Sequence, residues 1–165
     1  MGLIQLAAPE NRDQLLELTA ATGVFKPLEI ETLGEVLDDY FSINHQHQHQ
    51  SNAYWHEDQI IGFNYYAPAA MTDRTWYLYW IAVDPKFQKL GIGRSLMLQA
   101  EYQIAQLDGR ILFIETSSLP GYDATRSFYL RMGYECTGIL KDYYCDGDDM
   151  VVFRKRLRKL TQKPV

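Results

Sequence analysis

Two glycines after a polar loop are the residues of this sequence whose type and spacing most directly suggest chemistry. Gly91 and Gly93 follow Gln88, and an apolar pattern with helical spacing begins directly after them. Glycine has no Cβ atom, so backbone N–H groups at these positions are able to turn toward one point. The first N–H groups of the helix and the positive end of its dipole face the same point. The pattern therefore predicts an anion site suited to a diphosphate, and Arg94 adds a positive charge to it.

Two other kinds of phosphate-binding loop do not fit these residues. A dinucleotide-binding fingerprint needs a third glycine at the position that Leu96 occupies. A P-loop needs Gly-Lys-Ser/Thr and an earlier glycine, whereas Gly93 is followed by Arg94 and Ser95. A Gly-x-Gly pair by itself is also compatible with the ordinary start of a helix, so the assignment depends on the longer pattern around it.

The apolar pattern predicts the elements that position this loop. We expect strands at 3–6, 53–56, 60–67, 75–83, 111–116, 134–141 and 150–156, and helices from Pro9, after Pro27, at 92–107 and at 123–132. The two glycines thus lie at the point where the fourth strand leads into the third helix. No repeat and no linker interrupts this order, so the sequence predicts one mixed α/β domain over residues 1–165.

The length and composition limit the classes of function that are open to this protein. A chain of 165 residues buries roughly 68–70% of the surface that its unfolded form exposes, which is enough for one core. Its 47% hydrophobic and 22% charged residues exclude disorder and low complexity. The net charge of −5 argues against a general nucleic-acid-binding protein, because such a protein needs a basic face.

The cysteines and the first residues indicate the compartment. The only cysteines, Cys136 and Cys145, do not form a CxxC pair, which argues against a disulfide framework and a structural zinc site. The first residues lack the basic segment of a signal peptide, and no apolar run is long enough to span a bilayer. We therefore expect a cytoplasmic protein that binds neither nucleic acid nor a membrane.

Two stretches of the sequence are similar to the signatures of a known family. The stretch from Val83 to Gly93 resembles the acetyl-CoA signature of the GNAT N-acetyltransferases, Gln/Arg-x-x-Gly-x-Gly/Ala, and the stretch 124–134 resembles the family helix that ends in Phe-Tyr-x-x-x-Gly-Phe/Tyr. The likeness covers nearly the whole chain and extends, at residues 23–25, 115–118 and 144–149, to small bacterial members without a settled substrate. The resemblance implies a mixed, mostly antiparallel sheet with splayed central strands, flanked by about four helices.

The resemblance also implies where acetyl-CoA binds as a cosubstrate. The pantetheine would bond to the backbone near Ile81 and Val83, and an N–H group near Val83 would polarise the thioester carbonyl. The diphosphate would lie on the loop with the two glycines. The implied cofactor-binding residues are Ile81, Ala82, Val83, Gln88, Lys89, Leu90, Gly91, Ile92, Gly93, Arg94, Ser95 and Arg126.

The transfer itself needs an acid and a base. An amine with a pKa of about 10.4 is only about 0.04% neutral at pH 7, so a base or a desolvating pocket must free its lone pair. Tyr129 stands at the tyrosine position of the family helix and is the candidate acid for the leaving thiolate. In the predicted helix 123–132, Phe128 falls on the inward face, so we expect Tyr129 at the edge of that face. Tyr122 stands where many relatives have a cofactor-binding asparagine, and the fourth strand lacks the acid that many relatives use as a base.

Glu115, or a water that it holds, is therefore the candidate base. Its carboxylate follows a buried apolar strand, where a charge is costly unless it is paired or functional. An ion pair with a nearby Arg or Lys is the alternative interpretation. Other residues that could hold a water are Tyr77, Tyr79 and Asp142.

Three weaker patterns have a structural interpretation beside a functional one. The alternating His45, His47 and His49 would share one face of a strand and could bind a metal. No Cys or carboxylate accompanies them, so we expect a solvated loop or strand end and no metal. Cys145 could carry an acyl group, but the acidic turn beside it favours an inert thiol. The basic C-terminal residues indicate a solvated face rather than a contact with an anionic partner or the adenosine 3′-phosphate; they are Arg154, Lys155, Arg156, Arg158, Lys159 and Lys163.

The sequence thus predicts an acetyl-CoA-dependent N-acetyltransferase that moves an acetyl group directly to an amine of a small molecule or peptide. The acidic chain favours a cationic acceptor. An acyl-CoA-binding sensor, or a catalytically impaired protein of the same fold, is the alternative, because no acid stands in the fourth strand. We expect a monomer or a homodimer.

Overall fold

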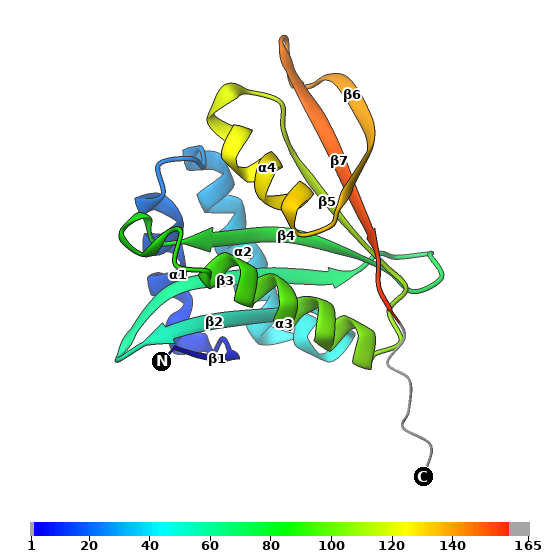
Figure 1. The fold of residues 1–165 in the computed structure, drawn as a ribbon. Helices are drawn as coiled ribbons and strands as arrows, with labels where there is room; N and C mark the ends of the chain where they lie inside the picture. Colours follow the sequence, from blue (N-terminus) through cyan, green and yellow to red (C-terminus); the bar gives the residue numbers. More distant parts are fainter. Residues whose placement is uncertain (1, 159–165) are drawn as a thin grey trace. The chain divides into compact units, whose positions relative to one another are not determined.

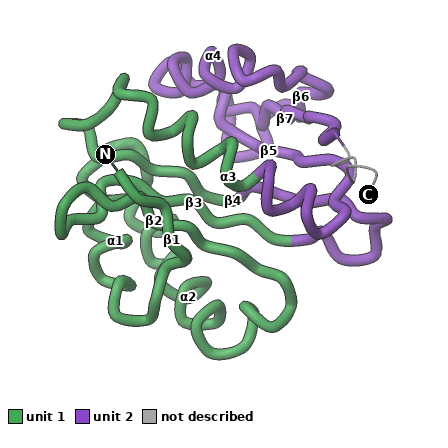
Figure 2. Tube along the Cα trace, turned by 60° about the horizontal axis from the view of Figure 1, so that its bottom comes forward, with its two compact units in different colours: residues 1–67, 79–100 green, residues 68–78, 101–165 purple. Residues whose placement is uncertain are grey.

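The computed structural model describes residues 2–158 and forms two compact units (Figure 2). Unit 1 consists of residues 1–67 and 79–100, and unit 2 of residues 68–78 and 101–165. The strand order is β1-β2-β3-β4-β5-β7-β6, and β4 (Thr75–Val83) is shared by both units (Figure 1). The predicted fold class is confirmed, since the pairs β1–β2, β2–β3, β5–β7 and β6–β7 are antiparallel, and β4–β5 is parallel. The splay of the central strands and the single domain stay predictions.

Unit 1 carries three strands of its own and two helices, and it includes the start of a third helix. Its elements are β1 (Leu3–Leu6), α1 (Arg12–Ala21), α2 (Pro27–Ser42), β2 (Gln50–His56), β3 (Gln59–Pro68) and the beginning of α3 (Ile92–Gln106). The apolar spacing of α2 has the predicted effect, because Leu33, Leu37 and Tyr40 are buried. The guanidinium of Arg12 joins α1 to α2 by binding both carboxylate oxygens of Asp38, at 2.5 and 2.8 Å.

Two apolar clusters lie on opposite faces of the strands of unit 1 (Figure 1). One joins α1 and α2 to the sheet through residues that include Leu15, Leu37, Phe63 and Tyr65. The other joins the start of α3 to the sheet through Ile61, Ile92 and Leu96, with Ile81, Val83 and Phe87 packed against them. Gly62 lets these layers approach, because a Cβ atom there would lie 3.0 Å from Ile92 Cγ2 and 3.3 Å from the Ala82 carbonyl oxygen.

Unit 2 is built around three strands and one helix. Its elements are the beginning of β4, β5 (Ile111–Ser117), α4 (Asp123–Arg131), β6 (Glu135–Cys145), β7 (Asp148–Arg156) and the end of α3. β4 pairs with β5 from Thr75↔Ile111 to Leu78↔Ile114. The β6–β7 hairpin continues to Cys145↔Asp148, so both strands extend beyond their predicted ends toward the turn, where Gly147 has a φ of +83°.

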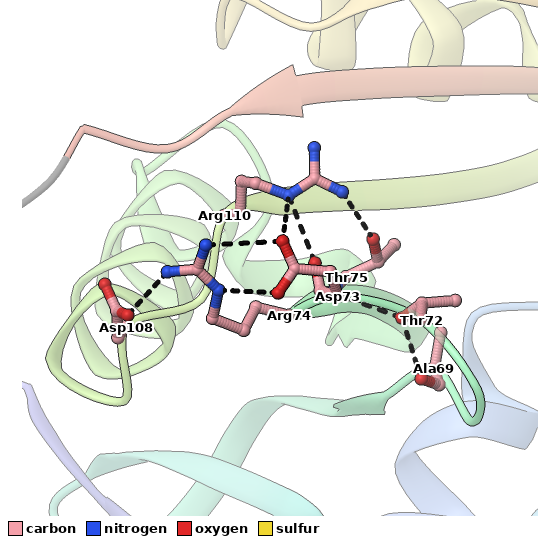
Figure 3. Close-up of polar contacts among 7 residues, drawn as sticks. All are labelled: Ala69, Thr72, Asp73, Arg74, Thr75, Asp108 and Arg110. Atoms are coloured by element: carbon pink, nitrogen blue, oxygen red, sulfur yellow. Dashed lines mark hydrogen bonds and ion pairs between the residues drawn. The ribbon is translucent and has the colours of Figure 1, made fainter.

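An ion-pair network fixes the turn between β3 and β4 in unit 2 (Figure 3). Arg74 Nη1 donates to Asp108 Oδ2 at 2.6 Å, and Arg74 Nε donates to Asp73 Oδ1 at 2.9 Å. Arg110 Nε donates to the Asp73 carbonyl oxygen at 3.1 Å, and Arg110 Nη2 donates to Thr75 Oγ1 at 3.4 Å. These contacts join the β3–β4 turn to the α3–β5 turn.

The basic residues near the end of β7 differ from the predicted solvated face. Lys155 Nζ lies 2.8 and 2.7 Å from the two carboxylate oxygens of Glu101 and 2.8 Å from the Met132 carbonyl oxygen. Arg154 forms an ion pair with Glu135. The alternation of β7 explains the difference, because it turns these side chains toward neighbouring acids. Arg156 and Arg158 are exposed, and Lys159 and Lys163 lie outside the described residues.

Candidate functional site

The β4–α3 loop, residues 84–91, holds the predicted anion site within unit 1. The Asp84 N–H donates to the Ile61 carbonyl oxygen at 2.9 Å, which extends the pairing with β3 to the end of β4. The Asp84 carboxylate then accepts the Lys86 N–H at 2.9 Å and begins a short 3₁₀ turn. Gln88 Nε2 donates to the Val83 carbonyl oxygen at 3.3 Å, so this side chain folds back onto the strand. The start of the loop is therefore fixed by its own polar contacts.

Two left-handed residues shape the end of the loop. Gly91 has a φ of +83°, and a Cβ atom there would meet nothing within 4 Å, so the backbone borders open space. Lys89 has a φ of +65°, an uncommon conformation for a residue with a side chain. The Ser95 N–H donates to the Gly91 carbonyl oxygen at 2.9 Å. The N–H groups of the three residues before Ser95 have no partner inside the helix and stay available to an anion.

Three cations surround this helix start. The side chains of Lys86, Lys89 and Arg94 are exposed. Among residues 2–158, none of the three forms an ion pair with an acid. Unpaired cations, free N–H groups and the positive end of a helix dipole are the features that suit the predicted anion site.

The segment Ile81–Val83 leads into this loop and is the part of β4 predicted to bind the pantetheine. Ala82 is buried in the cluster with α1 and α2, whereas Ile81 and Val83 pack on the opposite cluster with α3. The predicted pantetheine-binding segment is thus held between two packed layers, whereas most of the predicted residues of the loop that follows are exposed. Leu90, also predicted, is 71% exposed at the tip of the loop.

Tyr129, the candidate acid, is buried in unit 2. The prediction placed Phe128 on the inward face of its helix and Tyr129 at the edge, and this is wrong: Tyr129 is 3% exposed and Phe128 is half-buried. The Tyr129 ring centroid lies 5.6 Å from that of Phe153 and 6.1 Å from that of Tyr134. Burial raises the pKa of Tyr129, and within the described residues its hydroxyl has no hydrogen-bond partner. The group therefore keeps its proton at neutral pH.

Glu115, the candidate base, lies near the end of β5 in the same unit. Its side chain is exposed, and no ion pair with a described Arg or Lys is formed, so the alternative interpretation as an ion pair is not supported. Incomplete hydration beside the sheet raises the pKa of Glu115, and a hydrogen bond from Tyr77 partly offsets this rise. A raised carboxyl pKa makes Glu115 a stronger base than an ordinary glutamate.

Arg126, which was predicted to bind the cofactor, is occupied by its own unit. Its Nη1 donates to the carbonyl oxygens of Ser117 and Leu119 at 2.5 and 3.1 Å, and its Nη2 forms an ion pair with Asp123. This arrangement indicates a structural role in holding the segment between β5 and α4. Periodicity did not reveal it, because the carbonyl partners follow from the path of the backbone.

Two motifs that lie far apart in the sequence meet at the end of β5. Ser117 Oγ donates to the buried Asp148 carboxylate at 2.5 Å, and the Asp149 N–H donates to Ser118 Oγ at 2.8 Å. The stretches 115–118 and 144–149 thus form one hydrogen-bonded unit. The sequence pattern singled out both stretches but did not predict their contact.

The histidine stretch is less solvated than predicted. His45 and His47 are exposed, whereas His49 is half-buried, and its Nδ1 lies 2.6 Å from the Tyr65 hydroxyl oxygen. The spacing of the three histidines did not signal this contact, because residues 44–47 form a 3₁₀ turn and only His49 stands next to the start of β2. Across residues 2–158, no group of three His, Cys, Asp or Glu side chains could hold a metal ion. In the same range, no helix is long and apolar enough to cross a membrane.

Comparison with known proteins agrees with the geometry of the loop and the order of the elements. The family profile described as "Acetyltransferase (GNAT) domain" matches residues 47–136, which is more than half of the 165 residues. An uncharacterized N-acetyltransferase of Methanocaldococcus jannaschii is 33% identical over 79 residues, which is 46% of this chain and 48% of that protein. The match thus spans about half the length of this curated relative.

Two solved structures extend the comparison to the whole chain. A protein of Desulfovibrio desulfuricans assigned to the GNAT family is 30% identical, with a TM-score of 0.92 over 96% of this chain and 100% of that chain. An aminoglycoside 6′-N-acetyltransferase complexed with coenzyme A has a TM-score of 0.75 at 17% identity over 99% of each chain, a likeness that shows the fold alone. With a family match over more than half of its length and a 30% identical structure along 96% of it, the chain belongs to the GNAT family of acetyltransferases.

Proposed function

We propose that this protein transfers the acetyl group of acetyl-CoA directly to the amine of a small molecule or peptide. The β4–α3 loop is the observation that carries the proposal. It combines three exposed cations without ion pairs in the described chain, the free N–H groups of a helix start, and open space beside Gly91. These features fit the diphosphate and 3′-phosphate of coenzyme A, and the likeness to a coenzyme A complex supports the same ligand.

The chemistry of the transfer assigns a role to each remaining group. The amine nitrogen forms a bond to the acetyl carbon, the carbon–sulfur bond breaks, and the electron pair stays with the sulfur. An N–H group near Val83 stabilises the charge on the thioester oxygen. Glu115, or a water bound to it, takes the proton from the amine, and Tyr129 gives its proton to the thiolate. The raised pKa of Glu115 strengthens the base, and the raised pKa of Tyr129 keeps this group protonated at pH 7 while making it a weaker acid than an ordinary tyrosine.

Gly93→Glu tests the ligand assignment. Gly93 lies in the first turn of α3 and has helical backbone, so a residue with a side chain can adopt its conformation, and a glutamate there favours the helix dipole. Its carboxylate repels a diphosphate at the same place. We expect calorimetry to show no acetyl-CoA binding by Gly93→Glu, with an unchanged circular dichroism spectrum.

Gly138→Glu is the matched control. It makes the same change on β6, where a Cβ atom would meet nothing within 4 Å. We expect this variant to bind acetyl-CoA like the wild type. Unchanged affinity in a folded Gly93→Glu variant would remove the β4–α3 loop as the binding site.

A panel of amines separates the enzyme from an acyl-CoA sensor. The release of coenzyme A thiol is followed with butylamine, 1,4-diaminobutane, benzylamine and a tripeptide with a free N-terminus. A transferase releases thiol faster with at least one amine, and the acidic chain favours the diamine. Tight acetyl-CoA binding without release for any amine would favour the sensor.

A further inference from the structure

Unit 1 contains a hydrogen bond inside an aromatic cluster, and the proposed transfer assigns no role to it. The cluster is centred on Tyr65, whose ring lies 5.7 Å from Tyr40, 5.9 Å from His49, 6.4 Å from Tyr79 and 6.1 Å from Trp80 between centroids. Tyr65 is 2% exposed, whereas Tyr79 is 52% exposed. We call these residues the Tyr65 cluster. Its centre is therefore inside the core of unit 1, and its rim reaches the surface.

The direction of the His49–Tyr65 hydrogen bond follows from burial. The two atoms, His49 Nδ1 and the Tyr65 hydroxyl oxygen, are 2.6 Å apart. A buried hydroxyl that does not donate leaves its hydrogen without an acceptor, which is unfavourable. Among the described residues His49 is the partner of this hydroxyl, so Tyr65 donates and Nδ1 accepts. The imidazole is then neutral and carries its hydrogen on Nε2.

The Tyr65 cluster is joined through β4 to Ile81–Val83, the segment predicted to bind the pantetheine. Tyr79 and Trp80 belong to the cluster and directly precede Ile81–Val83 in the chain. Their ring centroids lie 6.2 Å apart. Aromatic faces attract ammonium groups, so the exposed ring of Tyr79 beside Ile81–Val83 suits an incoming amine.

We propose that His49 is a positioning residue that holds, through Tyr65, the Tyr79 and Trp80 rings in place for the acceptor amine, and that it does so when neutral. The proposal rests on the proposed function, because the amine is received beside the acetyl group. A proton added to His49 goes to Nδ1 and removes the acceptor of the Tyr65 hydroxyl. The buried hydroxyl must then turn, and the rings packed against Tyr65 shift with it.

The charged and titratable groups around His49 support its neutral form at pH 7. Burial and the neighbouring His47 both lower the pKa of His49 from its usual value of 6.5. Burial raises the pKa of Tyr65, and the electrostatic effects of Tyr40 and Asp39 on α2 and of Tyr79 on β4 raise it further. Both groups therefore stay neutral at pH 7, and acid first protonates His49.

Nuclear magnetic resonance of the protein without acetyl-CoA tests this coupling. The Trp80 indole and Tyr79 ring resonances, assigned with Trp80→Phe and Tyr79→Phe, are followed from pH 8 to about pH 5. In the wild type both should shift with the midpoint of the His49 ring itself. In His49→Asn they should stay constant, because the side-chain oxygen of Asn accepts from Tyr65 and does not titrate. Constant resonances in the wild type, or a titration that persists in His49→Asn, would overturn the proposal.

His47→Asn is the matched control, since His47 is exposed and adjacent in the chain. The Trp80 titration should persist in this variant, with a slightly higher midpoint because one cation near His49 is gone. Loss of the titration in His47→Asn would assign the coupling to His47 and contradict the proposal.

Kinetics with the fastest amine of the panel measure the consequence for transfer. His49→Ala and Tyr65→Phe should each raise the KM for the amine by roughly 3- to 30-fold and leave acetyl-CoA affinity unchanged. His49→Asn should keep the wild-type KM for the amine at pH 7.5. At pH 5 its KM should be lower than that of the wild type, because the asparagine does not titrate. Wild-type KM values in His49→Ala and Tyr65→Phe would overturn the proposal. A panel without turnover would instead contradict the proposed function, whereas the resonance experiment does not depend on it.

Discussion

Two groups of basic side chains in this protein have opposite surroundings. In the β4–α3 loop of unit 1, Lys86, Lys89 and Arg94 are exposed and, within the described chain, form no ion pair. Where the β3–β4 turn meets the α3–β5 turn in unit 2, Arg74 and Arg110 are held by the two nearby aspartates, Asp73 and Asp108 (Figure 3). Both groups lie in loops next to β4, so exposure alone does not separate them.

The difference lies in what each loop does with its polar groups. In unit 2, Asp73 and Asp108 bind Arg74, and the Asp73 carbonyl oxygen accepts a hydrogen bond from Arg110. These contacts fix the conformation of the two turns. In the β4–α3 loop, the carboxylate of Asp84 accepts a backbone N–H group instead of pairing with a cation, and the cations of the loop are exposed to solvent. A cation without an acid beside it is ready to bind an anionic ligand, and a paired cation is a structural tie.

The same contrast extends to the candidate catalytic groups of unit 2. Tyr129 has no hydrogen-bond partner among the described residues, and Glu115 has no cation. Arg126, in contrast, is fully engaged. The predictions below test whether unpaired groups serve the reaction and paired groups serve the fold, from the largest expected effect to the smallest.

Glu115→Gln is expected to have the largest effect on turnover. Loss of the base should lower kcat by about 10²- to 10⁴-fold below the pKa of the amine. Stability should not fall at pH 7, because the pKa of Glu115 is raised in the folded state and its ionisation opposes folding as the pH rises. Stopped-flow detection of thiol release and thermal unfolding measure the two effects. A wild-type rate from pH 6 to 8 would reduce Glu115 to a structural residue.

Tyr129→Phe is expected to have a moderate effect. The ring contacts with Phe153 and Tyr134 remain, so the variant should fold, while the proton for the thiolate is lost. We expect kcat to fall by roughly 10- to 10³-fold with little change in acetyl-CoA affinity. Pre-steady-state kinetics must show that chemistry limits the rate. A wild-type kcat under that condition would show that Tyr129 only packs.

Arg94→Ala and Arg74→Ala compare the two basic groups directly. Arg94→Ala should weaken acetyl-CoA binding by about 3- to 30-fold, less at high salt, without a change in Tm. Arg74→Ala should leave the affinity unchanged and lower the Tm slightly, because Asp73 and Asp108 lose their partner. Calorimetry and thermal unfolding of both variants give the result. Equal effects on affinity would end the distinction between unpaired and paired cations.

Asp73→Asn is expected to have the smallest effect, and it depends on pH. The hydrogen bond from Arg74 lowers the pKa of Asp73 below its usual value of 3.8. A lowered carboxyl pKa stabilises the fold above that value, and the stabilisation is lost as the pH falls through the lowered pKa. The Tm of Asp73→Asn should therefore be slightly lower than that of the wild type at pH 7, and the difference should shrink in acid. A constant difference would assign the effect to packing.

The sequence by itself determined the order of the elements and the position of the β4–α3 loop. The stripe of α2 and the breaks at Asp84 and Gly91 are local signals, since helix periodicity and glycine conformation act within a few residues. For the same reason the sequence correctly placed Gln88 and Gly91 in the loop between β4 and α3, with Gly93 at the start of the helix.

Only the tertiary structure decided which polar groups are paired. Lys155 looked free in the sequence, but the fold brings the Glu101 carboxylate and the Met132 carbonyl oxygen from distant segments to it. Arg126 is bound by nearer groups, the Ser117 and Leu119 carbonyl oxygens and Asp123, because the chain folds back between β5 and α4. His49 looked solvated, but the path of β3 brings Tyr65 within 2.6 Å of its ring. Periodicity also chose the wrong neighbour in α4, because nine residues allow a small rotation that exchanges Phe128 for Tyr129. The contacts of Lys155 and His49 join segments far apart in the chain, and the spacing of residues within one segment carries no information about such contacts.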